Sequence, residues 1–185
     1  MPARRIWTIG HSIRSAEEFI GLLCANDIAG LADVRTIPRS RRHPHFGKEQ
    51  LEAFLKDEAI EYRHFPVLGG LRKPKVDSPN SGWRNLAFRG YADHMQSREF
   101  SSAIEALLEF GDDVRLAVMC AEAVWWQCHR MLISDALVAR DVDVQHIMSQ
   151  RGRSTLQPHR LTPFARVEVA STADAMPRVW YPGLV

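Results

Sequence analysis

Short apolar runs that favour β-strands alternate with segments of helical periodicity along most of the chain. The strand-like runs occupy positions 5–9, 28–34, 61–65, 114–119 and 142–147. Segments with apolar residues at helical spacing accompany them, at 15–26, 51–55, 91–95, 97–108 and 132–137. This alternation predicts βαβ units. We therefore expect an α/β fold built on an open, mostly parallel sheet of about five strands with helices on both faces.

The length of the chain favours one domain. Its 185 residues suit a single full core, and they fall short of the ~250 residues that a complete eight-stranded α/β barrel needs. We predict a single α/β domain over residues 1–185, with a long irregular insertion, or lid, at about 66–90 that Gly and Pro residues punctuate. A C-terminal tail, at about 168–185, follows one further strand-like run at 165–169.

The charged residues are segregated along the chain, although the formal net charge is only +2. Fifteen of the 24 basic residues, but only Asp77 of the 22 acidic residues, lie in three segments, 34–48, 62–92 and 144–167. A basic surface beside an acidic remainder favours an anionic partner. We therefore expect the protein to bind an anionic small molecule or a nucleic acid.

Two features of the sequence bear on where the protein works. No apolar run approaches the ~20 residues that span a membrane, and the first residues lead into a strand-like run without a signal-peptide stretch. The three cysteines are an odd number, which is not typical of a disulfide framework. We predict a cytoplasmic protein with reduced thiols and no membrane partner, and the sequence carries no signal for an oligomeric state.

Polar or ionisable side chains follow each of the five predicted strands at one edge of the sheet. Open α/β sheets bind ligands outside the carboxyl ends of their strands. The residues at these ends are His11, Asp33 with Arg35, Tyr62 to His64, Cys120 with Glu122, and His146. This edge is therefore the predicted functional site.

The segment from Cys120 to Arg130 joins the fourth predicted strand to the next helix. Such a junction offers free N–H groups and the positive end of a helix dipole, which suits an anion. A thiol beside Arg130 would have a lowered pKa and serve as a nucleophile. Cys120 has a competing structural role, because cysteine is among the most buried residue types.

These considerations assign roles at the predicted edge. The predicted catalytic residues are Cys128 as nucleophile and Glu122 with His11 for proton transfer. His129 and Arg130, at the start of the helix, are predicted to bind the anion.

The segment after the second predicted strand carries five cations and no acid between residues 35 and 48. The planar fork of arginine suits phosphate oxygens, and an aromatic ring such as that of Phe46 suits a base. The alternative is a solvated charged loop. Because the segment leaves a strand end, we predict that it binds the anion through Arg35, Arg39, Arg41 and Arg42.

Arginines and aromatic residues alternate in the last part of the long loop, from Trp83 to Tyr91. This pattern predicts a lid over an anionic substrate or a groove for single-stranded nucleic acid, with Tyr91 among the substrate-binding residues. Packing in the core is the alternative for Trp83, Phe88 and Tyr91.

A zinc site is the rival interpretation of the edge residues. Permissible zinc ligands there are Cys128, His129, His11, His64 and Glu122. However, Cys120 and Cys128 are eight residues apart, and neither a Cys-x-x-Cys nor a His-Glu-x-x-His pattern occurs. We therefore assign no metal ligand and no cofactor from the sequence.

Five motifs together resemble a known family. They are Thr8-x-Gly10-His11-Ser12, Asp33-Val34-Arg35-x-x-Pro38-x-Ser40, Leu68-Gly69-Gly70, Phe88-x-Gly90-Tyr91 and Cys120-Ala121-Glu122-x5-Cys128-His129-Arg130. In this combination, from about residue 5 to residue 166, the chain resembles the bacterial and archaeal domain-of-unknown-function family 488. The resemblance implies that the basic segment and the cysteine segment belong to one site, and it implies no particular reaction.

The sequence as a whole favours an enzyme, a hydrolase or transferase, that acts on a phosphate-bearing substrate at a basic site on the carboxyl edge of the sheet. The substrate would be a nucleotide or a nucleic acid. Two alternatives stay open. One is a nucleic-acid-binding module without catalysis, and the other is a zinc-dependent enzyme or a structural zinc protein.

Overall fold

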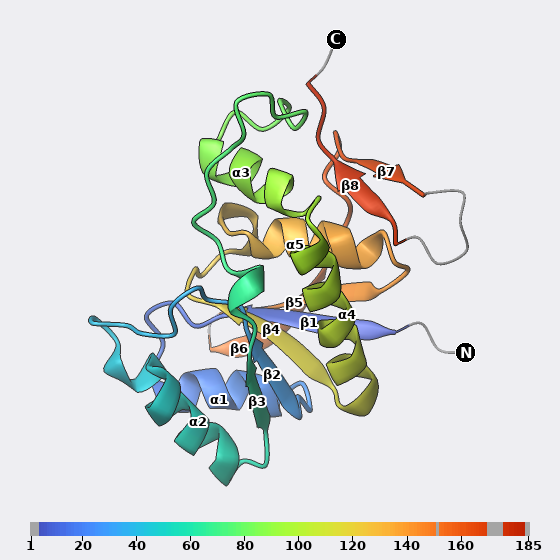
Figure 1. Cartoon of the computed structure of the whole chain (residues 1–185). Helices are drawn as coiled ribbons and strands as arrows, with labels where there is room; N and C mark the ends of the chain where they lie inside the picture. The colour runs from blue at the N-terminus through green and yellow to red at the C-terminus, as the bar shows by residue number, and fades with distance from the viewer. Residues whose placement is uncertain (1–3, 151, 170–175, 184–185) are drawn as a thin grey trace.

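The structure, a computed structural model, describes residues 4–150, 152–169 and 176–183 (Figure 1). Parts of two predicted segments lie outside the described residues. They are residues 1–3 of the predicted domain and residues 170–175 and 184–185 of the predicted C-terminal tail.

Six strands form one open sheet in the order β3-β2-β4-β1-β5-β6. The strands β3, β2, β4, β1 and β5 run parallel to one another, and β6 at the edge is antiparallel to β5. The strands are β1 (Arg5–Gly10), β2 (Gly30–Asp33), β3 (Glu61–His64), β4 (Leu116–Cys120), β5 (Asp143–Gln150) and β6 (Arg153–Pro158). The predicted α/β fold with a mostly parallel sheet is therefore confirmed, with β6 as an additional antiparallel edge strand.

Helices cover both faces of this sheet, as predicted (Figure 1). One face carries α1 (Ala16–Cys24) and α2 (Lys48–Asp57), and the other carries α3 (Leu86–His94), α4 (Arg98–Asp113) and α5 (Arg130–Val138). The shorter elements are η1 (Pro44–Phe46), η2 (Pro66–Leu68), η3 (Trp125–Gln127) and the hairpin of β7 (Arg166–Glu168) with β8 (Arg178–Trp180). Among the described residues, no helix combines the length and the apolar character needed to cross a membrane.

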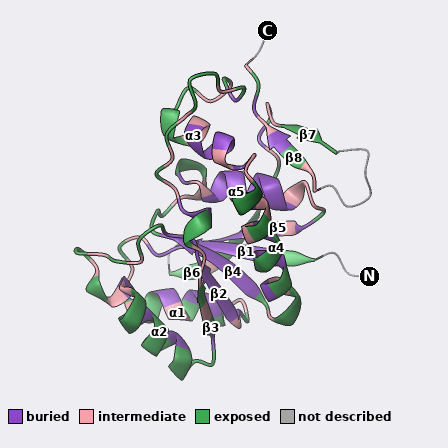
Figure 2. Cartoon of the chain, in the orientation of Figure 1, coloured by how far each residue is buried: buried purple, intermediate pink, exposed green. Residues whose placement is uncertain are grey.

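Side-chain alternation in β4 divides the core into two halves. Leu116, Val118 and Cys120 pack on the α4–α5 side, whereas Ala117 and Met119 pack on the α1–α2 side. Every residue of this central strand is buried (Figure 2), as expected for a strand covered on both faces. The alternation therefore directs the thiol at the end of β4 toward the start of α5.

The structure corrects two details of the predicted elements. The sequence did not indicate β6, because most of its side chains are exposed and polar and carry no apolar alternation. The irregular insertion ends before Leu86 rather than at Gly90, because the Asn85 side chain caps α3 by accepting from two backbone amides. Gly90 lies inside this helix, where a Cβ atom would overlap the main-chain oxygen of Arg72.

A chain of buried hydrogen bonds ties β1, β5 and α5 to the C-terminal strands. Thr8 Oγ1 lies 2.7 Å from His146 Nδ1, and His146 Nε2 lies 3.0 Å from His159 Nδ1. The Asp135 carboxylate accepts from His159 Nε2 at 2.9 Å and from the Tyr181 hydroxyl at 2.8 Å. Because the carboxylate must accept, each imidazole uses its Nε2–H as donor and its Nδ1 as acceptor. The network is thus satisfied with both histidines neutral.

This network predicts a loss of stability in mild acid. Burial, together with His159 and Arg130, lowers the pKa of His146 from 6.5 to about 2. Between these pH values the unfolded chain binds a proton that the folded protein does not. We expect the free energy of unfolding to fall as the pH drops below 6.5, by up to about 1.4 kcal/mol per pH unit from this group alone.

Urea unfolding of the wild-type protein and His146→Gln between pH 7 and pH 5 measures this effect. The decline should be smaller in the variant. His11, whose pKa burial lowers to about 4, titrates in both proteins and cancels in the comparison. Equal declines in the two proteins would show that protonation of His146 is not coupled to unfolding.

Candidate functional site

The candidate site forms where β1 and β4 end side by side. Gly10 at the end of β1 pairs with Cys120 at the end of β4. The helices that follow these strands, α1 and α5, cover opposite faces of the sheet, so the two chain segments diverge here. Such a topological switch point opens a crevice at the carboxyl edge, where open α/β sheets bind ligands.

Gly10 lets the two strand exits approach closely. A Cβ atom at this position would overlap the main-chain oxygen of Glu122 and lie 2.8 Å from Nη2 of Arg130. The amides of the next two residues donate to carbonyls of the β4 exit at 2.9 Å. Only glycine fits at this point, because any side chain would push the two exits apart.

Two thiols and one imidazole converge beneath this edge. The ligand atoms of Cys120, Cys128 and His129 all lie within 4.8 Å of one another. His129 Nδ1 is 3.7 Å from the Cys128 sulfur and 4.0 Å from the Cys120 sulfur. The Cys128 and Cys120 residues are 2% and 5% exposed, and neither forms a disulfide. This cluster is the densest group of reactive side chains at the edge.

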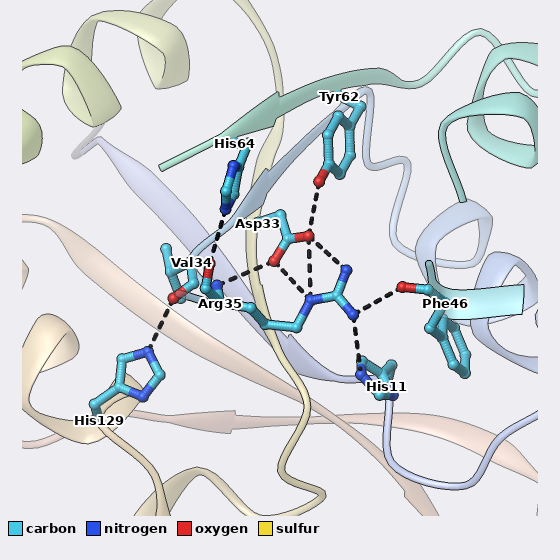
Figure 3. Close-up of polar contacts among 8 residues, drawn as sticks. All are labelled: His11, Asp33, Val34, Arg35, Phe46, Tyr62, His64 and His129. Carbon is cyan, nitrogen blue, oxygen red and sulfur yellow. Dashed lines mark hydrogen bonds and ion pairs between the residues drawn. The ribbon is translucent and has the colours of Figure 1, made fainter. Parts of the chain in front are cut away.

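A backbone carbonyl fixes the orientation of the His129 ring (Figure 3). His129 Nε2 donates to the carbonyl oxygen of Val34 at 3.2 Å. In the neutral imidazole, Nδ1 therefore carries the lone pair, and it is this atom that faces both sulfurs. The lone pair of the ring is thus available to a proton or a metal ion between the thiols.

The surroundings favour ionisation of one thiol over the other. A hydrogen bond from the Cys120 thiol holds the pKa of Cys128 well below its ordinary value against the effect of burial, and His129 and Arg130 act in the same direction. The same hydrogen bond, together with burial, raises the pKa of Cys120. In addition, the backbone amide of Arg130 lies 3.5 Å from the Cys128 sulfur. Cys128 is therefore the more acidic thiol of the pair.

Arg130 is a buried cation without a carboxylate partner in the described part of the chain. The residue is 1% exposed, and its Nη2 donates to the main-chain oxygen of Glu122 at 2.6 Å. Its Nε is buried and has no hydrogen-bond partner among the described residues. An isolated buried charge is costly. The Arg130 guanidinium is therefore held by a main-chain oxygen, with no carboxylate of the described residues to balance its charge.

Arg14 brings a second guanidinium to the same place. Its Nη1 donates to the carbonyl oxygen of Gly10, and burial followed by the charge of Arg130 lowers its pKa. His45 of the basic segment donates to the Arg14 carbonyl at 2.9 Å. Arg14 also borders a cleft of about 550 Å³ whose polar lining includes Ser12, Glu18, Ser149 and Ser154. Two cations therefore flank the end of β1.

Arg35, a predicted anion ligand, is instead satisfied within the protein (Figure 3). Its Nε and Nη2 donate to the Asp33 carboxylate at 2.9 and 2.6 Å, and its Nη1 donates to the Phe46 carbonyl at 2.8 Å. Tyr62 donates a further hydrogen bond to Asp33 at 2.7 Å. His64 donates to the Arg35 carbonyl. This buried ion pair fixes the exit of β2 at the edge.

His11 is buried against the same ion pair. Its Nδ1 donates to the Ser12 carbonyl at 2.9 Å, and its Nε2 faces Nη1 of Arg35 at 3.5 Å. The ring stacks on Phe46 with 4.2 Å between centroids. Burial, with a contribution from Arg35, lowers its pKa to about 4. His11 is therefore neutral and faces a guanidinium with its free lone pair.

The remaining predicted residues are dispersed. Arg39, Arg41 and Arg42 are exposed on the segment between β2 and η1, and among the described residues their side chains form no hydrogen bond or ion pair. Arg39 borders a second cleft, of about 510 Å³. Glu122 is exposed, and its main chain rather than its carboxylate holds Arg130. Tyr91 is buried and donates its hydroxyl to the Leu68 carbonyl at 2.7 Å.

Sequence reasoning missed two members of this site. Arg14 lies four residues after Gly10, and its place just beyond a strand end was the signal that could have found it. For Cys120 the sequence supported either a chemical or a structural role. Cys120 follows Leu116 and Val118 at two-residue intervals in β4, and this alternation was the signal that it faces α5.

The fold and the site together define an open α/β protein with a thiol–imidazole cluster and a buried arginine at the topological switch point. The chain belongs to the family described as domain of unknown function DUF488, whose model matches residues 15–137. This match covers more than half of the chain and confirms the family resemblance. Comparisons with curated proteins and with solved structures found no match.

The close approach at Gly10 gives a paired prediction. Gly10→Ala should lower the free energy of unfolding by about 1–3 kcal/mol, because the new methyl group has no space. Gly21→Ala is the control, since no heavy atom lies within 4 Å of its Cβ position in the exposed side of α1. That variant should gain about 0.5–1 kcal/mol from helix propensity. Urea unfolding compares both, and a Gly10→Ala protein as stable as the wild type would contradict the packing described.

The Asp33–Arg35 pair gives another prediction. Asp33→Asn keeps the side-chain shape but leaves Arg35 as a buried cation, which should cost about 3–5 kcal/mol of unfolding free energy. Tyr62→Phe removes a single hydrogen bond to the same carboxylate and should cost about 1 kcal/mol. Equal losses in the two variants, measured by chemical unfolding, would show that the ion pair does not anchor the β2 exit.

Proposed function

We propose that the protein is an enzyme that acts on a phosphate-bearing substrate, a nucleotide or a nucleic acid, at the carboxyl edge between β1 and β4. The observation that carries the proposal is Arg130, which is buried and has no carboxylate partner among the described residues, and whose backbone amide lies 3.5 Å from the Cys128 sulfur. A buried cation is costly unless an anion accompanies it. A phosphate group supplies that charge and matches the planar fork of arginine.

The surroundings of Arg130 support the same substrate class. Arg14 adds a second cation at the end of β1. The adjoining cleft of about 550 Å³ carries hydroxyl groups from Ser12, Ser149 and Ser154. Its volume lies within the range of small-molecule sites, about 300–1,000 Å³. A nucleotide held here would place its phosphate beside Arg14, which borders the cleft at the strand end that Arg130 also approaches.

The reactive groups of the proposed enzyme lie next to this anion site. Cys128 carries the lowered pKa, and His129 presents its lone pair to the sulfur. Exposed Glu122 is the proposed proton-transfer group, whereas neutral His11 serves to position Arg35. Group transfer or hydrolysis fits these residue types. Because the cysteines are free thiols, we propose that the enzyme works in the reducing cytoplasm.

The exposed arginines favour one alternative, a nucleic-acid-binding module without catalysis. Arg39, Arg41 and Arg42 lie on a segment without acids and are open to solvent. In that case binding would depend mainly on these side chains and would fall steeply with salt. The enzyme proposal instead assigns the main phosphate contacts to Arg14 and Arg130.

Titration calorimetry with ATP and with a short single-stranded DNA tests this assignment. We expect Arg14→Gln to weaken ATP binding by about 10-fold or more, because it removes a charge-assisted hydrogen bond. Arg41→Gln is the matched control and should change ATP binding less than about twofold, as an exposed charge does. Equal losses, or losses with Arg41→Gln alone, would refute the assignment.

Catalysis is tested with the same ligands. A panel of nucleotides and oligonucleotides incubated with the full-length protein should yield a product with at least one member. Cys128→Ser should abolish turnover while ATP binding stays within about threefold, because the reacting thiol is distinct from the arginines that hold the phosphate. Tight, salt-sensitive binding without any product would favour the binding module.

A further inference from the structure

We propose that Cys120, Cys128 and His129 form a Zn²⁺ site with three protein ligands and one open position. The sequence alone gave no zinc-binding pattern, because the two cysteines are eight residues apart. The fold brings them together. Cys120 ends β4, while Cys128 and His129 directly precede α5, which packs on the same face of the sheet.

The distances within the cluster match a tetrahedral zinc site. Zinc bonds of about 2.3 Å to sulfur and 2.0–2.1 Å to nitrogen place neighbouring ligand atoms about 3.6 Å apart. In the protein His129 Nδ1 lies 3.7 Å from one sulfur and 4.0 Å from the other, and the three atoms fall within 4.8 Å. Small side-chain adjustments, mainly of the two sulfurs toward each other, would bring all three to bonding distance of one ion.

The imidazole is oriented as a metal ligand. Metal-bound histidines generally donate their second ring N–H to a carboxylate or a backbone carbonyl, and His129 Nε2 donates to the carbonyl of Val34. Nδ1 is left unprotonated toward the sulfurs. Gly70 keeps space beside this nitrogen, since a Cβ atom there would lie 3.0 Å from Nδ1. The Tyr91 ring packs against the His129 imidazole, with 5.2 Å between the two ring centroids.

The ligand types favour zinc over magnesium and calcium. Thiolate and imidazole are ligands that Zn²⁺ accepts together, whereas Mg²⁺ and Ca²⁺ require oxygen. Two thiolates would neutralise the ion inside the core, where a net charge is costly. Among the residues that the structure describes, this is the one group of three or more metal-ligating side chains.

The open fourth position gives the site a chemical use. Three-ligand zinc sites are typically catalytic, because water or substrate completes the coordination. Arg130, beside Cys128, would hold an anionic substrate next to that position. This use rests on the proposed substrate class and makes Cys128 a zinc ligand in place of the nucleophile, whereas metal binding itself rests only on the cluster.

Metal analysis of the full-length protein tests the site. Protein purified without chelators should contain one zinc per chain by mass spectrometry. Replacement by Co²⁺ should give the sulfur-to-cobalt charge-transfer band and the intense visible bands of tetrahedral thiolate coordination. No stoichiometric zinc and no charge-transfer band would overturn the proposal. In protein stripped of metal with a chelator, a zinc stoichiometry that stays well below one per chain on re-addition of Zn²⁺ would also overturn it.

Variants locate the ligands. Cys120→Ser, Cys128→Ser and His129→Ala should each weaken zinc binding by at least about tenfold, the lower limit for residues that merely orient ligands. Cys24→Ser is the matched control, because this third cysteine is exposed on α1, and it should retain one zinc. Loss of zinc from Cys24→Ser, with retention in the other cysteine variants, would refute the assignment.

Two further measurements separate loss of the zinc site from misfolding and from loss of phosphate binding. The cobalt spectrum of the wild-type protein needs no variant, so a variant that fails to fold does not remove the test. Arg14→Gln separates the two proposals, because it should lose phosphate affinity and keep zinc. Zinc binding without phosphate binding would leave the metal site intact and refute the proposed substrate, and the opposite result would refute the metal site alone.

Discussion

The close approach of the β1 and β4 exits at Gly10 is the constraint on which the candidate site depends. Without a side chain at this position, the main chain of Glu122 and the guanidinium of Arg130 can lie against the end of β1. That contact sets the path of the β4 exit, and with it the start of α5. The alternation of β4 then directs Cys120 to the same side as Cys128. One glycine thus determines where the thiols and the buried cation meet.

Much of the fold could be predicted from the sequence because its signals are local. The apolar runs marked β1 to β5, and apolar residues at helical spacing marked the helices between them. The signals failed where local sequence does not express tertiary contact. β6 is polar because most of its residues face solvent, and it forms by pairing with β5. Gly90 looked like a loop residue, although its role is to let α3 approach the backbone at Arg72.

The position of the candidate site could be predicted from the sequence, but the side-chain contacts within it could not. The rule that ligands bind at the carboxyl ends of parallel strands pointed to the edge where Cys120, Cys128 and His129 lie together in the structure. It could not distinguish Arg35, whose charge is matched by Asp33, from Arg130, which has no carboxylate partner among the described residues. This difference depends on side-chain geometry across the sheet. For the same reason, spacing along the chain concealed the cluster that Cys120 and Cys128 form with His129.

The central claim is that the edge between β1 and β4 is one anion-binding site centred on Arg130. Titration of ¹⁵N-labelled protein with ATP, followed by NMR, tests it most directly. The account predicts the largest shift changes at the backbone amides of Ser12, Arg14 and Arg130, which flank the switch point in three dimensions. Shift changes confined to the exposed basic segment, residues 39–48, would contradict it.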